Sequence, residues 1–415
     1  MEGFAMVQRR EYLDQLKKWR DEQVIKVITG IRRCGKSTLL EIFQNELKAD
    51  GVTEDQIISI NFEELEFEEL LDYKALYNYV KERLHKTKTT YVFLDEIQQV
   101  ENFQKAVDSL YVKKNVDVYI TGSNAYLLSG ELATLLSGRY VEINMLPLSF
   151  AEFYELKTGE GDGDKDALFA EYMRYGGFPY VPKLGDDSDM IDTYLEGIYN
   201  TIIVKDIDER QKRKERDPNK RKVNDIALLK NVSKFLASSI GNPVSVKSIA
   251  DYVTSGGRKV SQNTVDDYME ALVEPYIFYP VERYDVVGKQ LLKKNRKMYI
   301  VDLGLRRHLL ARKKYDLGFS LENIVFFELL RRGYSVNIGK VGVTEIDFVA
   351  RKNDEVLYYQ VTASMVEEST FEREMKPLKS ISDNYPKTVI TLDRFTVGNY
   401  DGISVVNAID WLLKA

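Results

Sequence analysis

The first 150 residues alternate between apolar runs and amphipathic stretches. Apolar runs that predict buried strands lie at 24–28, 91–96, 116–121 and 140–143. Apolar residues at helical spacing follow the first run, from residue 37. Strands that alternate with helices are typical of a parallel sheet, so the pattern predicts an α/β core over residues 1–150.

The pattern changes three times after this core. Residues 151–224 read as helices followed by a charged stretch with Pro218 inside it, and we interpret them as a helical lid and a linker. Residues 225–318 read as three helices and a hairpin, whose strands are predicted at 277–284 and 297–302 with a wing loop between them. Two of these helices, at 246–253 and 263–272, have the spacing of a helix-turn-helix, which predicts a winged helix. Residues 319–415 read, in this order, as a helix, three strands, a helix and a strand. This succession predicts a second, smaller α/β domain.

The strand at 24–28 runs into Gly-Ile-Arg-Arg-Cys-Gly-Lys-Ser, which matches the phosphate-binding P-loop, GxxxxGK[ST]. Glycines let successive N–H groups point at an anion, and the following helix N-terminus adds partial positive charge. We expect Lys36 to reach the β- and γ-phosphates of ATP and Ser37 to ligate Mg²⁺. The alternative is a chance glycine-rich turn, but the flanking strand and helix favour a P-loop. The predicted nucleotide-binding residues are Gly30, Arg33, Cys34, Gly35, Lys36, Ser37 and Thr38.

Polar residues at the ends of later strands supply the rest of a hydrolytic site. The strand at 91–96 ends in Asp95 and Glu96, a Walker B pattern in which Asp95 holds Mg²⁺ and Glu96 polarises the attacking water. Asn124 follows the next strand and can orient that water. Arg139, at the start of the strand at 140–143, is a candidate arginine finger, and a surface arginine is the alternative.

These motifs resemble the AAA+/STAND-type prokaryotic ATPases that are related to archaeal initiator-like ATPases. The matching segments are 30–37, 60–63, 94–96, 122–123 and 176–179. The resemblance implies that Asn124 is the sensor 1 residue and that Pro179 packs near the adenine. It also implies that the helix after Arg9 flanks the base. It further implies a P-loop AAA+ sheet with a helical lid, followed by a winged helix and a restriction-endonuclease-like domain.

Composition narrows the cellular setting. A chain of 415 residues predicts two to four domains. No apolar run approaches the roughly 20 residues that a membrane-spanning helix needs, and the N-terminal residues lack a signal-peptide core. The single cysteine, Cys34, excludes an internal disulfide, and with only His85 and His308 no usual zinc site can form. We therefore expect a cytoplasmic protein without membrane contact.

Charge suggests where DNA could bind. The net charge of −6 argues against a nucleic-acid coat protein, but the loop of the predicted wing is basic. The predicted DNA-binding residues are Lys289, Lys293, Lys294 and Arg296. The preceding helix carries Asp266, Asp267 and Glu270, whereas a major-groove reader usually presents Arg, Lys, Asn or Gln. A winged helix that serves as a spacer or a protein contact is the alternative.

The strand order of residues 319–415 resembles the PD-(D/E)xK nuclease core, in which two acidic or amide side chains bind Mg²⁺ and a lysine two residues on stabilises hydroxide. Asp347 and Gln360 match the first two positions, and Glu322 or Glu328 can complete the site from a helix. Thr362 stands where the lysine is expected. Because threonine carries no positive charge, we expect a degenerate site in a fold retained for docking.

Three functions fit these patterns. The first is an ATP-hydrolysing AAA+ ATPase that binds or remodels DNA, forked or branched DNA included, as an oligomer such as a hexameric ring. The second is a STAND-like switch in which nucleotide controls assembly and the C-terminal half docks a protein. The third is a nuclease that ATP gates. DNA-stimulated turnover, DNA-independent association and metal-dependent cleavage, respectively, distinguish them.

Overall fold

The computed structural model describes residues 7–125, 136, 138–159, 161–214, 225–311 and 316–414, with the side chains of 205–214 and 293–295 excepted. The chain forms two compact units. Unit 1 contains Met1–Pro147 and Glu274–Tyr276, and unit 2 contains Leu148–Val273 and Ile277–Ala415. The division into four domains at 150, 224 and 318 stays a prediction.

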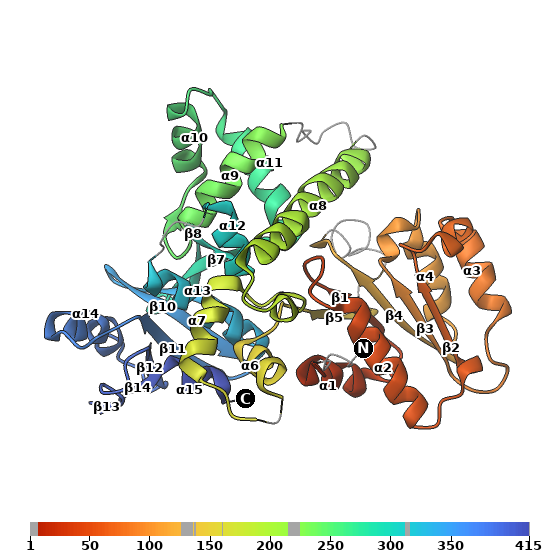
Figure 1. Cartoon of the computed structure of the whole chain (residues 1–415), viewed down its shortest axis with the longest axis horizontal. Coiled ribbons are helices and arrows are strands. Elements are labelled where there is room, and N and C mark those ends of the chain that lie inside the picture. The colour runs from red at the N-terminus through yellow and green to blue at the C-terminus, as the bar shows by residue number, and fades with distance from the viewer. Residues whose placement is uncertain are drawn as a thin grey trace. The chain divides into compact units, whose positions relative to one another are not determined.

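Unit 1 is the predicted parallel α/β core. Its strands pair in the order β2-β3-β4-β1-β5, and all of the pairs are parallel. Figure 1 shows the sheet with its helices. The elements are α1 (Arg10–Trp19), β1 (Ile25–Thr29), α2 (Lys36–Ala49), β2 (Ile57–Asn61), α3 (Tyr73–Glu82), β3 (Thr90–Asp95), α4 (Phe103–Tyr111), β4 (Val116–Gly122) and β5 (Tyr140–Asn144).

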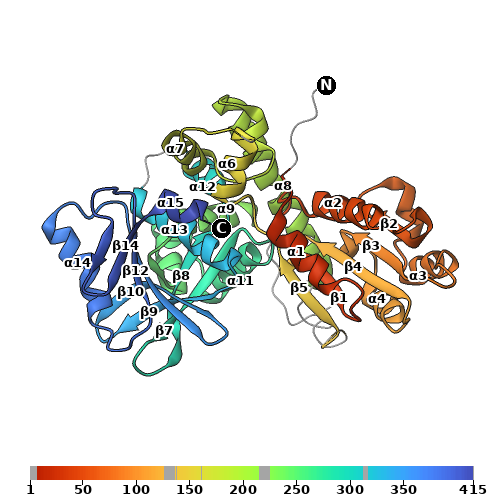
Figure 2. The ribbon, with the colours of Figure 1, turned by 90° about the horizontal axis from the view of Figure 1, so that it is seen from below.

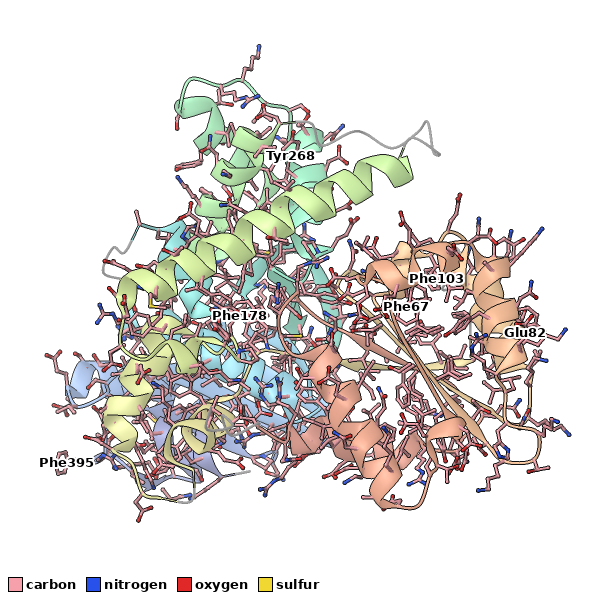
Figure 3. All side chains as sticks on the ribbon, turned by 45° about the vertical axis from the view of Figure 1, so that its right-hand side comes forward. Phe67, Glu82, Phe103, Phe178, Tyr268 and Phe395 are labelled. Carbon is pink, nitrogen blue, oxygen red and sulfur yellow. The ribbon has the colours of Figure 1, made fainter. Side chains whose placement is uncertain are left out.

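Alternation along β3 explains the two layers of helices. Successive side chains of a strand point to opposite faces. Val92 and Leu94 join the core cluster that contains residues of α3 and α4, and Phe67 and Phe103 of the same cluster are labelled in Figure 3. Phe93, between them in sequence, stacks on Tyr119 with ring centroids 4.8 Å apart and meets Phe43 of α2 edge-on at 6.3 Å. The sheet is therefore buried on both faces, which accounts for its continuous apolar strands.

Unit 2 begins with helices. These are α6 (Phe150–Thr158), α7 (Lys165–Tyr175), α8 (Ser188–Lys214), α9 (Ile226–Ser238), α10 (Val246–Ser255) and α11 (Gln262–Val273). A capping box starts α6, because Ser149 and Glu152 exchange side-chain to backbone hydrogen bonds of 2.8 and 3.1 Å. The helices predicted at 246–253 and 263–272 are confirmed as α10 and α11. Helix α8 continues into the predicted linker, of which residues 215–224 lie outside the described residues.

Strands dominate the remainder of unit 2. They are β6 (Pro243–Val244), β7 (Phe278–Asp285), β8 (Gln290–Ile300), β9 (Ser335–Val341), β10 (Thr344–Lys352), β11 (Glu355–Thr362), β12 (Lys387–Thr391), β13 (Gly398–Tyr400) and β14 (Ile403–Asn407). The helices among them are α12 (Leu303–Leu309), α13 (Leu317–Arg331), α14 (Glu368–Lys379) and α15 (Ala408–Leu413). Nine strands make one sheet, in the order β13-β14-β12-β11-β10-β9-β7-β8-β6. Figure 2 labels β14, β10 and β8 among these strands.

Two features of this sheet were not anticipated. The predicted hairpin of residues 277–302 shares it with the strands predicted for 319–415, because β7 pairs in parallel with β9. The loop expected between residues 284 and 297 is also largely wrong, since β8 already begins at Gln290. Helix α13 packs on one face through Phe326, and α14 packs on the other through Met375 and Leu378.

Candidate nucleotide site and a second charged cluster

The P-loop joins β1 to α2 through two glycines in backbone conformations that other residues rarely adopt. Gly30 has φ 144°, and a Cβ atom there would lie 2.1 Å from the carbonyl oxygen of Met145. Gly35 has φ 104° and precedes the first turn of α2. Arg33 is also left-handed, at φ 68°, and its side chain is exposed. The loop therefore needs glycine at both positions to wrap the N-terminus of α2.

Lys36 lies folded against the loop that surrounds it. Its ammonium donates to the carbonyl oxygens of Gly30 and Ile31, at 3.1 and 3.3 Å, and lies 3.5 Å from Glu96 Oε1. The side chain is 4% exposed. The structure thus brings together the lysine and the acid that the sequence assigned to phosphate binding and water activation.

The two carboxylates at the end of β3 have different surroundings. Asp95 accepts hydrogen bonds from the hydroxyls of Ser37 and Thr121, but burial outweighs both and raises its pKa. For Glu96, burial acts in the same direction. The charge of Lys36 and hydrogen bonds from Gln98 and Ser123 overcome it, so that the pKa of Glu96 is lowered. Glu96 therefore stays ionised, as a residue that polarises water must.

Other predicted residues of the site lie in three different places. Asn124 follows β4 at the same edge of the sheet and is buried, Cys34 is buried in the P-loop, and Thr38 is half-buried. Arg139 precedes β5 and so lies at the opposite edge of the sheet from the P-loop of its own chain. It forms an ion pair with Asp108 of α4 and is 40% exposed.

Pro179 lies in unit 2, in a motif whose glycines have a local role. Gly177 N–H donates to Asp302 Oδ2 at 2.7 Å, and a Cβ atom on Gly176 would lie 2.2 Å from Asp302 Oδ1. Burial raises the pKa of Asp302 to about 6, although backbone N–H groups from Gly177, Leu305 and Gly304 oppose the rise. Phe178 is fully buried (Figure 3). The contact between Pro179 and adenine stays a prediction.

Sequence reasoning missed the residues that hold the P-loop from outside. Arg9 has a left-handed backbone and a buried side chain, and it donates to the carbonyl oxygens of Cys34 at 3.0 Å and Leu146 at 2.6 Å. The hydroxyl of Tyr12 accepts from Leu146 N–H at 3.1 Å. Only their place at the start of the helix predicted to flank the base pointed to them.

The predicted wing residues are described in part. Lys289 is exposed and has φ 50°. Arg296 lies in β8 and is 3.6 Å from Asp266 of α11, so an acid of the predicted recognition helix partly neutralises it. The side chains of Lys293 and Lys294 lie outside the described residues. Contact between this surface and DNA stays a prediction.

The predicted nuclease-like residues divide between two places. Glu322 and Asp347 meet around Lys297 of β8, together with Glu345. Gln360 instead donates to Glu374 Oε2 of α14 at 3.0 Å, although its amide oxygen is 3.4 Å from Asp347 N. The hydroxyl of Thr362 donates to the carbonyl of Ser364 at 3.1 Å. Thr362 cannot provide the positive charge of a lysine. The structure instead places Lys297, from a strand far away in sequence, beside the acids.

Lys297 carried a weak signal that could have revealed it. It precedes the buried run Met298-Tyr299-Ile300, and its own side chain is 4% exposed. A lysine inside a buried strand requires carboxylate partners, because an unpaired buried charge is costly. In strand order β7 and β9 lie between β8 and β10, so sequence proximity could not identify those partners.

Comparison with known proteins agrees with the chemistry of unit 1. Residues 22–154 match the family described as an AAA domain, and residues 166–316 match a domain of unknown function. With the P-loop, the Ser37–Asp95 contact and the Lys36–Glu96 pair, this match defines unit 1 as a P-loop domain of the AAA class.

Two curated relatives extend over most of the chain. An uncharacterized protein of Haemophilus influenzae is 43% identical over 412 residues, which are 99% of each chain. The uncharacterized protein MJ1544 of Methanocaldococcus jannaschii is 32% identical over 346 residues, 80% of this chain and 71% of that protein. The chain belongs to the same family as these two uncharacterized proteins.

A solved structure, a Walker-type ATPase of Pyrococcus abyssi, matches 73% of this chain and 96% of its own, with a TM-score of 0.49 and 15% identity. Among the described residues, no helix is long and apolar enough to cross a membrane.

Proposed function

We propose that the protein hydrolyses ATP with Mg²⁺ and works on DNA as an oligomer. The observation that carries the proposal is the meeting of four side chains at one edge of the sheet. Ser37 contacts Asp95, and Lys36 contacts Glu96, each pair joining the P-loop to the end of β3. A site that binds and hydrolyses ATP uses a lysine at the phosphates, a hydroxyl and an aspartate at Mg²⁺, and a residue that orients water, and these four side chains supply those groups.

The residues present fit Mg²⁺ and ATP. A hydroxyl and a carboxylate, from Ser37 and Asp95, are oxygen donors of the kind that Mg²⁺ prefers. Bound Mg²⁺ supplies charge stabilisation at the phosphates. Lys36 binds the β- and γ-phosphates, Glu96 polarises water, Asn124 orients it, and Pro179 packs near adenine.

Arg139 is proposed to act on the nucleotide of a neighbouring protomer. Its position at the sheet edge opposite its own P-loop and its exposed side chain support a role in trans. Arg139→Ala should then reduce turnover by roughly 10³–10⁵-fold, with little change in ATP affinity. Mixing it with Lys36→Ala protein should restore some activity through hybrid sites. No recovery with assembly intact would contradict a role in trans.

DNA is the proposed partner, through the basic residues of β8 and the turn before it. Lys289 and Arg296 are described there, and Lys293 and Lys294 belong to the same stretch. Replacing all four with neutral residues should weaken binding equally for all sequences. Each lost phosphate contact should lower the salt-dependence slope by about 0.9. An unchanged slope would move the DNA contact elsewhere.

The deciding experiment measures ATP turnover and particle size with and without duplex, forked and four-way DNA. Turnover that DNA stimulates supports the proposal. Association that follows nucleotide but ignores DNA would instead establish the switch function. Metal-dependent cleavage that Asp347→Ala abolishes would establish the ATP-gated nuclease.

A further inference from the structure

Lys297 lies among three carboxylates that two elements supply. Its ammonium is 3.1 Å from Glu322 Oε1 of α13. It is 2.9 Å from Glu345 Oε1 and 3.9 Å from Asp347 Oδ1, both of β10. An ammonium group has three N–H donors, so Lys297 can pair with all three carboxylates at once. We call these four residues the Lys297 cluster.

The Lys297 cluster is largely closed to water. The side chains of Lys297 and Glu322 are 4% and 6% exposed, whereas Glu345 is 31% exposed and forms its surface edge. Tyr299 donates to Glu322 Oε1 at 2.5 Å, and Val361 N–H donates to Asp347 Oδ2 at 2.8 Å. The cluster is therefore both buried and hydrogen-bonded, the condition under which buried charges are tolerated.

Charge within the cluster is nearly balanced. Burial disfavours the charged ammonium, but the surrounding carboxylates outweigh it and raise the pKa of Lys297. Burial, followed by the charge of Glu322, holds the pKa of Asp347 well above its usual range. Arg283 lies 3.7 Å from Glu345. Lys297 and Arg283 therefore place two cations beside the three acids of the cluster.

A divalent cation does not fit this arrangement. Carboxylate oxygens are the ligands that Mg²⁺ and Ca²⁺ prefer, and the resemblance to nucleases implied such an ion here. Within the part of the chain that the structure describes, no three His, Cys, Asp or Glu side chains are placed to hold a metal ion. The ammonium of Lys297 stands among the acids where such an ion would be needed.

We propose that Lys297 is a built-in cation that replaces a divalent metal ion in this cluster and closes it to metals. The lysine also joins β8 to α13 and β10, so a single side chain supplies the charge and the cross-link that an ion would supply elsewhere. Removing the ammonium should free Glu322, Glu345 and Asp347 to move together around a divalent cation.

The test compares the full chain with its Lys297→Met variant in nucleotide-free buffer. Both carry Trp19→Phe, which leaves Trp411 of α15 in unit 2 as the single tryptophan. Its fluorescence then follows the unfolding of unit 2. We expect millimolar Mn²⁺ to leave the Tm of the parent protein, the full chain with Trp19→Phe, unchanged. Lys297→Met should lower Tm by roughly 10 °C, because acids lose their buried partner, and Mn²⁺ should restore part of the loss in a saturable manner.

Lys340→Met is the matched control. Lys340 lies in β9 opposite Glu345 and is half-buried, but it is not part of the Lys297 cluster. This variant should show neither the loss of Tm nor the response to Mn²⁺.

Asp347→Asn keeps the test decisive if Lys297→Met does not fold. Asparagine is nearly isosteric with aspartate, and burial together with the charge of Glu322 already disfavours a charged carboxylate at this position. The variant should therefore fold, retain its Tm within a few degrees and show no response to Mn²⁺. Saturable Mn²⁺ binding by the parent that Asp347→Asn abolishes would overturn the proposal. A folded Lys297→Met protein without any response to Mn²⁺ would overturn it as well.

Discussion

Lys36 of unit 1 and Lys297 of unit 2 are both buried beside carboxylates, but the two lysines have different partners. Lys36 of unit 1 is held by two carbonyl oxygens and lies 3.5 Å from one acid, Glu96. Lys297 of unit 2 is surrounded by three acids at 2.9 to 3.9 Å. An ammonium group with one acid nearby, such as that of Lys36, can bind a ligand instead. An ammonium group with three acids around it, such as that of Lys297, stabilises the fold. Burial of a lysine alone therefore does not distinguish a binding site from a structural one.

Lys36→Ala should abolish productive ATP binding and turnover, and it should lower stability less than Lys297→Met does, because Lys36 pairs with one acid and Lys297 with three. The lysine charge at the phosphates has no substitute nearby, and losing a buried charge partner costs about 2–5 kcal/mol of binding, or roughly two to three orders of magnitude in affinity. Calorimetry with ATP and thermal unfolding measure the two effects. Lys48→Ala, at an exposed lysine of the same helix, is the control. Normal hydrolysis by Lys36→Ala would contradict the site.

Glu96→Gln should leave ATP binding intact and lower kcat by about 10²–10⁴-fold. Only the carboxylate that polarises water is lost, while the contact between Ser37 and Asp95 remains. Single-turnover hydrolysis and ATP affinity separate the two quantities. An equal loss of hydrolysis rate and of ATP affinity would mean that Glu96 serves mainly as the charge partner of Lys36. The buried lysine of unit 1 would then have a structural role, as Lys297 has in unit 2.

Asp302→Asn tests the cost of buried charge in unit 2. The pKa of Asp302 is raised to about 6 in the folded state, against 3.8 for the unfolded chain. The unfolded state therefore loses its proton first as pH rises. Stability should fall by about 3 kcal/mol between roughly pH 4 and 6 and stay lower above that range. The asparagine variant should lack this component.

Urea unfolding of both proteins at several pH values measures that difference. A difference in stability that does not change with pH would show that Asp302 ionises in the folded protein as it does in the unfolded chain.

Arg9→Gln should have the smallest effect, a loss of roughly tenfold in ATP affinity, because about 1.5 kcal/mol of charge-assisted bonding to Cys34 and Leu146 is lost. Arg9→Lys should recover part of it. Arg10→Gln, at the adjacent exposed residue, should leave the affinity unchanged. If the Arg9 and Arg10 variants behave alike, Arg9 does not position the P-loop.

The sequence predicted local elements well and long-range partners poorly. Strands β1, β3, β4 and β5 lie within a residue or two of their predicted bounds, because buried parallel strands are continuous apolar runs. The motifs also assigned Lys36, Ser37, Asp95 and Glu96 to one site, whereas the contacts of Ser37 with Asp95 and of Lys36 with Glu96 are seen only in the structure. DNA contact, oligomer formation and the role of Arg139 stay predictions.

The alternation of apolar and polar residues along the strands could not predict the Lys297 cluster, for a second reason. The register of β9 and β10 shifts between Ile346 and Val349, and both Asp347 and Phe348 reach residues on the side of α13. A regular strand would send consecutive side chains to opposite faces. A bulge of this kind re-aims one side chain, and nothing in the local sequence marks it.

The parallel pairing of β7 with β9 has a consequence for how the chain can be divided. Arg283, Tyr284 and Asp285 pair with Ile338, Gly339 and Lys340, so a cut between residues 311 and 316 would leave two open strand edges where a continuous sheet had been. Exposed edges recruit other strands. Fragments made separately should therefore aggregate alone and reassemble when mixed.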